Sequence, residues 1–432
     1  MENERRDKIP RPLLFQMIII GISASGFAIF WYFEGGFFNT YITHVLKHEY
    51  FYMAVMVSLS AIMGLIFVFV FGIISDNTRT KIGRRRPYLL FGIIAGTAMI
   101  LFSFSPNFFW CIFFDVILIG VFANGYKAAN DALIPDIVDL EHRGRANAIV
   151  GIFSTIATIL PLILTLAVYE LYTIDVKGEK ILTQEGHFIV LLFGGFSIIF
   201  CSVIAFLFIR EPLSSSELPP KKTIIEEIKE TFRFSELKEQ KEFFKFILGM
   251  TIYNIGTKII AIYLFIYVFS LGLSILELII GILILGPIIL SSSLLLGKLS
   301  DKYGRKRFIA PLLIAGSVGC FILPFAGTAG NVNVILVLIG AILLMLGSTT
   351  LLIPLITWQQ DLLPDDKRGQ FIGILNITST LNQIPAAFLA AFIADTFDVQ
   401  WIFLLIPIFF IVSLLFFMRV KETLPSNEIE IK

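Results

Sequence analysis

Long, uninterrupted apolar runs dominate this 432-residue sequence and decide what it can fold into. A membrane-spanning α-helix needs about 20 predominantly apolar residues. The runs are continuous rather than alternating, which favours helices and excludes a membrane β-barrel. We therefore predict an all-α membrane protein with twelve spans, near 13–43, 51–74, 87–105, 108–132, 146–170, 187–209, 246–271, 275–297, 308–327, 332–357, 370–395 and 400–418.

Composition excludes the soluble alternatives. The chain is 56% apolar and only 16% charged, whereas soluble domains carry about 25% charged residues. A soluble enzyme, a nucleic-acid-binding protein and a disordered chain are therefore excluded. The net charge of +1 indicates no charge-driven partner, and no nucleic acid is expected. Three cysteines lie far apart inside apolar runs, which predicts neither disulfides nor a metal site: Cys111, Cys201 and Cys320.

Lysine and arginine counts predict the orientation of the spans. With the N-terminus in the cytoplasm, the cytoplasmic segments hold 29 of the 34 Lys and Arg residues, and the outer loops hold three. Cytoplasmic loops of membrane proteins carry such an excess. The first apolar run is also too long for a cleaved signal peptide. We expect a multi-pass protein of the cell membrane with both termini in the cytoplasm.

The two halves of the sequence repeat each other. GIISDNTRTKIGRRRP (72–87) follows span two, and GKLSDKYGRKR (297–307) follows span eight. LIPDIVDLEHRG (133–144) and LLPDDKRG (362–369) occupy matching places after spans four and ten. Both loop pairs share an offset of 225 residues, measured at Gly72 and Gly297 and at Arg143 and Arg368. Such a repeat indicates two structural units, so we predict pseudo-symmetric six-helix bundles at 1–210 and 243–432.

The charged segment 211–242 separates the two predicted bundles. The apolar spacing in IIEEIKETFRF is typical of an amphipathic helix on the inner membrane face. A solvated tether between the bundles is the simpler interpretation of the same residues.

Twelve spans, two parallel halves and the repeated G-x-x-x-D…G-R-R/K loop resemble the major facilitator superfamily. Within it, SDNTRTKIGRRRPYLL and LIPDIVDLEHRG resemble the glycoside and sucrose cation-symporter branches. The resemblance covers nearly the whole chain. It implies the major facilitator fold and alternating access between two bundles around a central site.

The repeated loops predict an inner gate. Glycines in them would let a neighbouring helix approach closely. Aspartates at matched inner ends of spans two and eight can meet a helix N-terminus or a cation. Anchoring at the inner membrane face is an equally good interpretation of any single arginine. The predicted gate residues are Gly72, Asp76, Arg84, Arg85, Arg143, Gly297, Asp301, Arg305 and Arg368.

Polar side chains inside the spans predict where a substrate binds. Such groups are costly in hydrocarbon and normally face the bundle interior or water. Spans seven and eleven each carry polar residues at helical spacing, and Lys258 lies near mid-membrane, where Glu34, Asp115 or the substrate could pair with it. Lys127 and Asp131 are better explained as a local i,i+4 pair. The predicted substrate-binding residues are Trp31, Asn254, Lys258, Asn376, Thr380 and Gln383.

Glu34 and Asp115 are the two acids placed well inside spans and away from the inner interface, so we predict that one of them carries a coupled proton. The resemblance favours a proton over sodium as the coupled ion. Sodium-coupled melibiose-type symporters carry two aspartates in span two where this chain has Val68 and Gly64. Sucrose-type proton symporters have an aspartate in span four, and Asp115 lies about five residues outward of that place.

We predict a proton-coupled sugar or glycoside symporter that uses no cofactor or metal. Its partners are a small-molecule substrate, the proton and the lipid bilayer. Efflux of small organic compounds is the first alternative, and a non-transporting membrane sensor or scaffold is a second. A membrane enzyme would need a catalytic cluster, and the four histidines are expected in loops, with His44 and His48 at the membrane interface.

Overall fold

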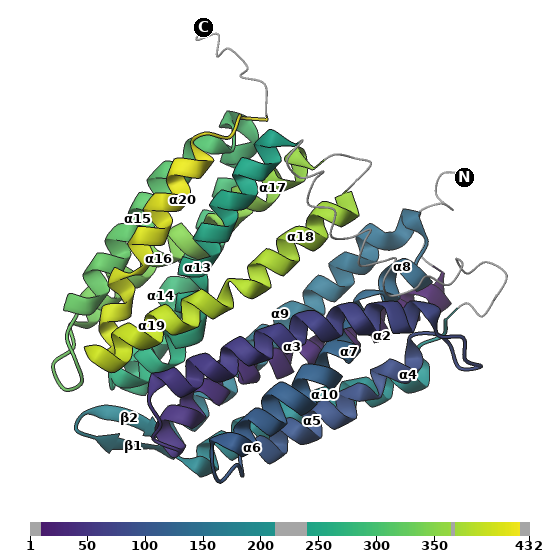
Figure 1. Cartoon of the computed structure of the whole chain (residues 1–432), viewed down its shortest axis with the longest axis horizontal. Helices are drawn as coiled ribbons and strands as arrows, with labels where there is room; N and C mark the ends of the chain where they lie inside the picture. Colours follow the sequence, from purple (N-terminus) through teal and green to yellow (C-terminus); the bar gives the residue numbers. More distant parts are fainter. Residues whose placement is uncertain (1–9, 212–239, 364–367, 424–432) are drawn as a thin grey trace, which may run out of the picture. The chain divides into compact units, whose positions relative to one another are not determined.

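The computed structural model describes residues 10–211, 240–363 and 368–423, which form two compact units (Figure 1). Unit 1 contains residues up to His48, Leu59–Thr173 and the segment from Leu182 onward, and unit 2 contains Glu49–Ser58, Ile174–Ile181 and the C-terminal half. The amphipathic-helix interpretation of 211–242 falls almost wholly outside the described residues.

Within the described residues, the first half contains four α-helices of more than 20 residues and five shorter ones. They are α2 (Arg11–Phe33), α3 (Tyr50–Asn77), α4 (Arg86–Leu89), α5 (Phe91–Phe102), α6 (Phe108–Ile112), α7 (Gly120–Asp131), α8 (Leu133–Ile137), α9 (Arg143–Tyr172) and α10 (Gln184–Phe208). In unit 1, α2 packs against α9 and α10, and α10 packs against α5.

The second half repeats this pattern. Its helices are α13 (Lys241–Ser270), α14 (Ile275–Tyr303), α15 (Ile309–Ile322), α16 (Val334–Met345), α17 (Leu352–Leu362), α18 (Arg368–Leu381), α19 (Gln383–Thr396) and α20 (Ile406–Phe417). In unit 2, α13 packs against α20 and α19, and α15 packs against α16 and α20.

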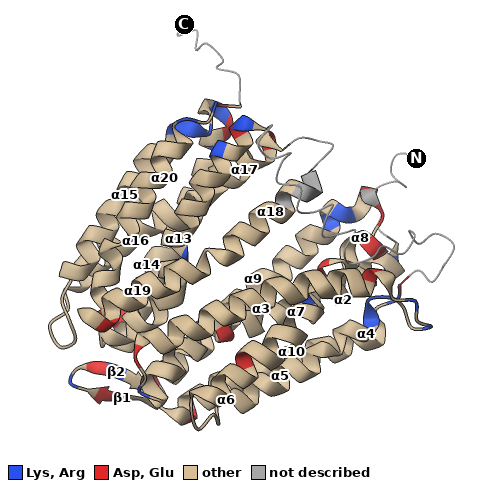
Figure 2. Ribbon diagram, viewed as in Figure 1, with Lys and Arg blue, Asp and Glu red and all other residues tan. Residues whose placement is uncertain are grey.

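Twelve spans are present in the described residues. Eleven helical segments are long and apolar enough to cross a membrane, and a shorter one, Arg86–Phe102, supplies the third span. Large apolar side chains such as Phe109, Leu171, Ile335 and Phe392 are about 70% exposed, which a bilayer tolerates and water does not. In Figure 2, charged segments gather at the helix ends and few interrupt the middle of either unit.

Helices in each unit meet through glycine. A Cβ added to Gly96 of α5 would overlap the carbonyl oxygen of Gly195 in α10, and the reverse holds for a Cβ on Gly195. In unit 2, a Cβ on Gly319 of α15 would lie 2.5 Å from the carbonyl oxygen of Gly340 in α16. Small residues let helix backbones approach closely in a membrane, where the hydrophobic effect does not drive helix association.

Span eleven is interrupted at Asn382, inside its predicted range. Span four runs past its predicted end, with a break at Ala132 before α8. Three residues after each break is a proline, Pro135 or Pro385, which has no N–H to bond the carbonyl four residues earlier. The chain between α9 and α10 also forms a β-hairpin, β1 (Thr173–Val176) and β2 (Glu179–Leu182), whose turn uses positive φ at Lys177 and Gly178. The prediction of a purely helical chain missed this hairpin.

Candidate functional site

Two arginines of unit 1 converge on one carboxylate. The Nε atoms of Arg84 and Arg85 lie 3.1 and 2.8 Å from Oδ2 of Asp136 in α8. Arg85 also binds Asp76 and the hydroxyl of Ser75. The Asp136 side chain is only 12% exposed, and that of Arg85 only 5%, so this is a largely buried charge network.

Glu211, just beyond α10, holds the backbone of the same loop. Its carboxylate accepts hydrogen bonds from the backbone N–H groups of Arg84, Arg85 and Arg86, at 2.8, 2.9 and 2.8 Å. A negative charge at a helix N-terminus is stabilising, here at the start of α4. Gly83 has φ +119°, and a Cβ there would lie 2.5 Å from Oε1 of Glu211. We call Asp76, Arg84, Arg85, Asp136 and Glu211 the first arginine cluster.

Unit 2 contains the matching arrangement. Nε of Arg305 lies 2.8 Å from Oδ2 of Asp361, and Nη2 lies 3.7 Å from Oδ1 of Asp301. The carboxylate of Glu422 accepts the backbone N–H of Lys306 at 2.8 Å. Gly304 has φ +91°, and a Cβ there would lie 2.8 Å from Oε2 of Glu422. Asp301, Arg305, Asp361 and Glu422 form the second arginine cluster.

The clusters contain four acids that the sequence analysis missed: Asp136, Glu211, Asp361 and Glu422. A signal was present, because Asp136 and Asp361 are 225 residues apart, the offset of the repeated loops. Glu211 and Glu422 each follow a cation, in the sequences REP and KET after spans six and twelve.

Other predicted gate residues behave differently from the expectation. Among the described residues nothing lies within 4 Å of a Cβ on Gly72, and the nearest atom to one on Gly297 is 3.8 Å away. The close helix approach expected at these glycines therefore stays a prediction. Arg143 donates to the carbonyls of Val138 and Pro135 at 3.1 and 2.9 Å, within its own loop. Arg368 begins α18, and its side chain lies outside the described residues.

The two acids predicted to carry a proton both lie in π-helical turns of unit 1. Glu34 opens the turn Glu34–Phe38 and is half-buried. Asp115 lies in the turn Phe113–Ile119, is 1% exposed, and accepts a long hydrogen bond from Ser60 at 3.4 Å. π-Helical turns are rare and occur frequently at functional sites.

Trp31 presents an aromatic surface on α2. Its side chain is 42% exposed, and its ring stacks on Phe27 with centroids 5.5 Å apart. Phe27 in turn stacks on Tyr126 of α7 at 5.9 Å. The Tyr126 hydroxyl is fixed by Ser23, at 2.7 Å from its Oγ. The indole of Trp31 is thus held by packing against Phe27, while much of the side chain stays exposed.

Unit 2 brings together the helices that carry the other predicted substrate residues. Asn254 and Lys258 are half-buried on α13, which packs against α18 and α19. Asn376 is exposed on α18, and the Thr380 hydroxyl donates to its carbonyl at 2.9 Å. Gln383 lies beyond the break and begins α19. The helix is interrupted at Asn382, between Thr380 and Gln383, and the assignment of these residues to a substrate site stays a prediction.

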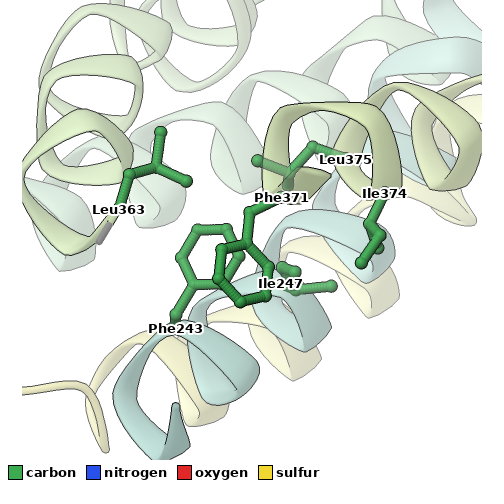
Figure 3. Close-up of a cluster of buried hydrophobic side chains, with 6 residues drawn as sticks. All are labelled: Phe243, Ile247, Leu363, Phe371, Ile374 and Leu375. Atoms are coloured by element: carbon green, nitrogen blue, oxygen red, sulfur yellow. The ribbon is translucent and has the colours of Figure 1, made fainter. Parts of the chain in front are cut away.

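A cluster of buried apolar side chains packs α13 against α18, nearer to the N-terminal ends of both helices than the polar positions. Phe243 and Phe371 face each other with ring centroids 5.0 Å apart, as Figure 3 shows. The remaining buried members of the cluster are Ile247, Leu363, Ile374 and Leu375. On both helices the polar residues follow this cluster in sequence, so they lie farther from the helix N-termini.

Two smaller predictions have clear outcomes. Lys127 and Asp131 form the expected i,i+4 ion pair on α7. All four histidines were expected in loops, but His44 lies in the π-helical turn Tyr41–Val45 and His187 lies in α10. His187 is fully buried on α10, with Nε2 3.0 Å from the Thr40 hydroxyl, and His44 Nδ1 accepts the N–H of Leu182 at 3.2 Å. His44 thus lies against His187, with ring centroids 6.3 Å apart.

Two α-helical units have matched charge clusters at their loops, and unit 1 also carries two acids inside its spans. Comparison with known proteins places the chain in a family. The profile described as Major Facilitator Superfamily matches residues 13–384 and 288–432. The chain belongs to this superfamily, whose members are transporters rather than enzymes.

Solved structures share the fold across nearly the full chain. A bacterial homolog of the human lysosomal transporter Spinster has a TM-score of 0.68 at 14% identity, covering 94% of this chain and 95% of that one. The xylose transporter XylE from E. coli has a TM-score of 0.65 at 13% identity, covering 96% and 98%. The nucleoside transporter NupG has a TM-score of 0.66 at 15% identity, covering 95% and 98%.

Sequence relatives match over shorter stretches. Multidrug resistance protein 3 of Bacillus subtilis (strain 168) is 32% identical over 133 residues, which is 31% of this chain and 25% of that protein. The general alpha-glucoside permease of Schizosaccharomyces pombe is 24% identical over 186 residues, 39% of this chain and 33% of that protein. The matches thus span a third or less of these relatives.

Proposed function

We propose that this chain carries a sugar or glycoside together with a proton across the cell membrane, by alternating access and with both termini in the cytoplasm. The observation that carries the proposal is Asp115, a fully buried carboxyl group in a π-helical turn of a membrane-spanning segment.

Proton coupling follows from the cost of charge inside a membrane. Ionisable groups within spans mark proton relays and substrate pathways. A carboxyl group that is shielded from water in one conformation and hydrated in another binds a proton in the first and releases it in the second. Asp115 is shielded in this conformation, and its neighbour Ser60 offers a neutral hydroxyl rather than a cation.

A hydroxyl-rich substrate suits the remaining side chains. The exposed indole of Trp31 offers a flat apolar face, and Asn254, Asn376 and Gln383 offer amides on neighbouring helices. Ligand sites combine apolar walls with a few polar groups that fix orientation. The xylose transporter fold and the glucoside permease match support this substrate class. Lys258 would donate to the substrate or neutralise an acid.

The test is uptake into proteoliposomes. With acid outside and alkaline inside, wild-type protein should accumulate one member of a panel of labelled sugars and glycosides, and a protonophore should abolish the accumulation. Asp115→Asn or Glu34→Gln should lose accumulation and keep substrate exchange, whereas Asp175→Asn in the hairpin should behave as wild type. If Asp115→Asn and Glu34→Gln both still accumulate the sugar, the coupled proton binds to another residue.

Cysteine accessibility tests the substrate site separately. The native cysteines Cys111, Cys201 and Cys320 are buried and can be replaced first. Single cysteines at positions 254, 258, 376 and 383 should then react with a water-soluble thiol reagent and be shielded by the sugar. Four unreactive positions in a protein that still transports would contradict this site.

Efflux of small organic compounds is the second candidate, because the multidrug resistance relative matches part of the chain. The same vesicles separate the two functions. A proton-driven exporter moves its substrate toward the acid side, whereas a symporter moves it toward the alkaline side.

A further inference from the structure

A chain of buried polar groups joins α2 to α7 inside unit 1. The Ser23 hydroxyl of α2 donates to Oδ1 of Asn130 in α7 at 2.6 Å. The Tyr126 hydroxyl of α7 lies 2.7 Å from Ser23 Oγ and donates to the Ser23 carbonyl at 3.0 Å. All three side chains are buried. A buried hydrogen-bond network of this kind makes the structure around it rigid.

The direction of these hydrogen bonds follows from the Asn130 side-chain carbonyl, which can only accept. A serine hydroxyl carries one proton, and that of Ser23 is donated to Asn130. The bond between Ser23 Oγ and Tyr126 therefore uses the tyrosine proton. Because this proton must point at oxygens of one residue, the hydroxyl end of the Tyr126 ring is fixed. A phenylalanine at position 126 would keep the ring and lose that fixation.

Three aromatic rings lead from this network to an exposed indole. The ring of Tyr126 stacks on Phe27 with an interplanar angle of 22°. Phe27 stacks on Trp31, one turn further along α2, at 23°. We call Tyr126, Phe27 and Trp31 the aromatic ladder. Its first ring is fully buried and its last is exposed. Since stacked rings have preferred geometries, the orientation of the buried ring constrains that of the exposed one.

Two glycines fix the rotation of the helices that carry the ladder. Gly26 and Gly125 directly precede its residues on α2 and α7. A Cβ on Gly26 would overlap Cys201 of α10, and a Cβ on Gly125 would lie 2.7 Å from Cδ2 of Phe91 in α5. Each glycine thus lets its helix pack closely against a neighbour. A rotation of either helix would bring a side chain into that contact, so the backbone also holds the ladder in place.

An exposed indole that is held in one orientation suits a ligand with a flat apolar face. The face of an aromatic ring is electronegative. A pyranose with equatorial hydroxyls presents axial C–H bonds, whose hydrogens are weakly positive, on a flat face. An open-chain polyol has similar hydroxyl groups and lacks this face. A fixed indole also loses less conformational freedom on binding than a mobile one, so its orientation should affect the affinity for a pyranose.

We propose that Tyr126, Ser23 and Asn130 are positioning residues, which hold the indole of Trp31 as a stacking platform for a pyranose sugar. The ligand in this inference rests on the proposed function, and the geometry rests on contacts within unit 1. The three residues act through Phe27 and Trp31 rather than by touching the sugar. A network with a purely structural role would stabilise α2 against α7 without changing the orientation of the indole.

Fluorine NMR tests the positioning without any substrate. The chain has four tryptophans, so protein labelled with 5-fluorotryptophan should give one resonance for each, and Trp31→Phe assigns one of them. Tyr126→Phe and Ser23→Ala should shift or broaden this resonance, because the indole then samples more orientations. Tyr267→Phe is the matched control, since this buried tyrosine also donates to a backbone carbonyl, that of Leu323, at 3.2 Å. It should leave the Trp31 resonance as in the wild type.

An unchanged Trp31 resonance in both Tyr126→Phe and Ser23→Ala would overturn the proposal. An equal change in Tyr267→Phe would also overturn it, because the indole would then respond to any loss of stability. If Tyr126→Phe does not fold, Asn130→Ala replaces it. This variant removes the acceptor at the other end of the network and should change the same resonance.

A double-mutant cycle then tests the route through Trp31. For the pyranoside that the uptake panel selects, Tyr126→Phe should raise KM about threefold to tenfold, as expected for the loss of one hydrogen bond. Its kcat should stay close to that of the wild type, because the platform contributes binding. In a Trp31→Ala background the same substitution should leave KM unchanged, since residues of one network are not additive. Equal losses in both backgrounds would overturn the proposal.

Competition with the open-chain polyol sorbitol tests the ligand class. Sorbitol should inhibit uptake of the pyranoside only weakly, and inhibition as strong as that by the unlabelled pyranoside would overturn the stacking platform. An absence of uptake by the wild type would count against the proposed substrate, while the fluorine resonances still decide whether the network positions Trp31.

Discussion

Asp136 is the residue on which the first arginine cluster depends. It forms ion pairs with both Arg84 and Arg85 in a site where little solvent reaches the three side chains. Removing one partner of a buried ion pair leaves an uncompensated charge. Asp136→Asn should therefore lower the free energy of unfolding by about 3 kcal/mol.

The measurement is denaturant or thermal unfolding of the protein in detergent, with Asp139→Asn as the control. Asp139 is an exposed acid three residues further along the same loop. Equal stability of the two variants would show that the cluster contributes nothing to folding.

Substitution of Asp76 or Asp301 should change the rate of transport rather than the free energy of unfolding. Their side chains are 46% and 69% exposed, and exposed ion pairs contribute little to folding. If both belong to an inner gate, Asp76→Asn and Asp301→Asn should slow sugar uptake while protein yield and substrate affinity stay close to wild type. Wild-type uptake rates in both variants would leave membrane anchoring as the role of these loops.

At the scale of elements, the contact between α5 and α10 depends on Gly96 and Gly195. Any side chain on Gly96 collides with the backbone of α10, so the helices must separate. Gly96→Val should cost about 1–3 kcal/mol of stability, as overpacking typically does, and should lower the melting temperature. Gly151→Val in α9 is the control, since the structure places nothing within 4 Å of a Cβ there. Equal melting temperatures would contradict this packing.

The hairpin should dock more firmly at acid pH. Burial raises the pKa of Glu179 above its usual 4.5, and the charge of Asp398 raises it further. Tyr50 and Asp395 are further titratable groups near Glu179 and Asp398, and the hairpin itself carries Asp175, Lys177 and Lys180. A raised pKa means that the folded state binds the proton more tightly, so stability falls as the pH rises from the unfolded to the folded pKa.

Glu179→Gln should therefore slow amide exchange at 174–181 at neutral pH and weaken its dependence on pH. Lys180→Gln provides a comparison on the same strand that leaves this carboxyl group unchanged. Exchange that keeps its full pH dependence in Glu179→Gln would assign the titration to another group.

At the scale of the whole molecule, apolar runs were enough to predict twelve spans, and the repeated G-x-x-x-D…G-R-R/K loops carried the resemblance to the superfamily. The loops that carry the arginines were also predicted from the sequence, because they repeat within it. Their acidic partners were missed, since Asp136 and Glu211 meet the arginines only after folding. The hairpin and the break at Asn382 depend on local backbone geometry, which apolar runs do not encode. The substrate and the coupled ion remain predictions.

The proposal that sugar and proton move together is tested by pH recording in a weakly buffered suspension of proteoliposomes. Adding the transported sugar outside should make the medium alkaline at once, because protons enter with the sugar. Asp115→Asn or Glu34→Gln should bind the sugar without that change. Sugar entry with no pH change in the wild type, or with acidification of the medium, would contradict proton symport.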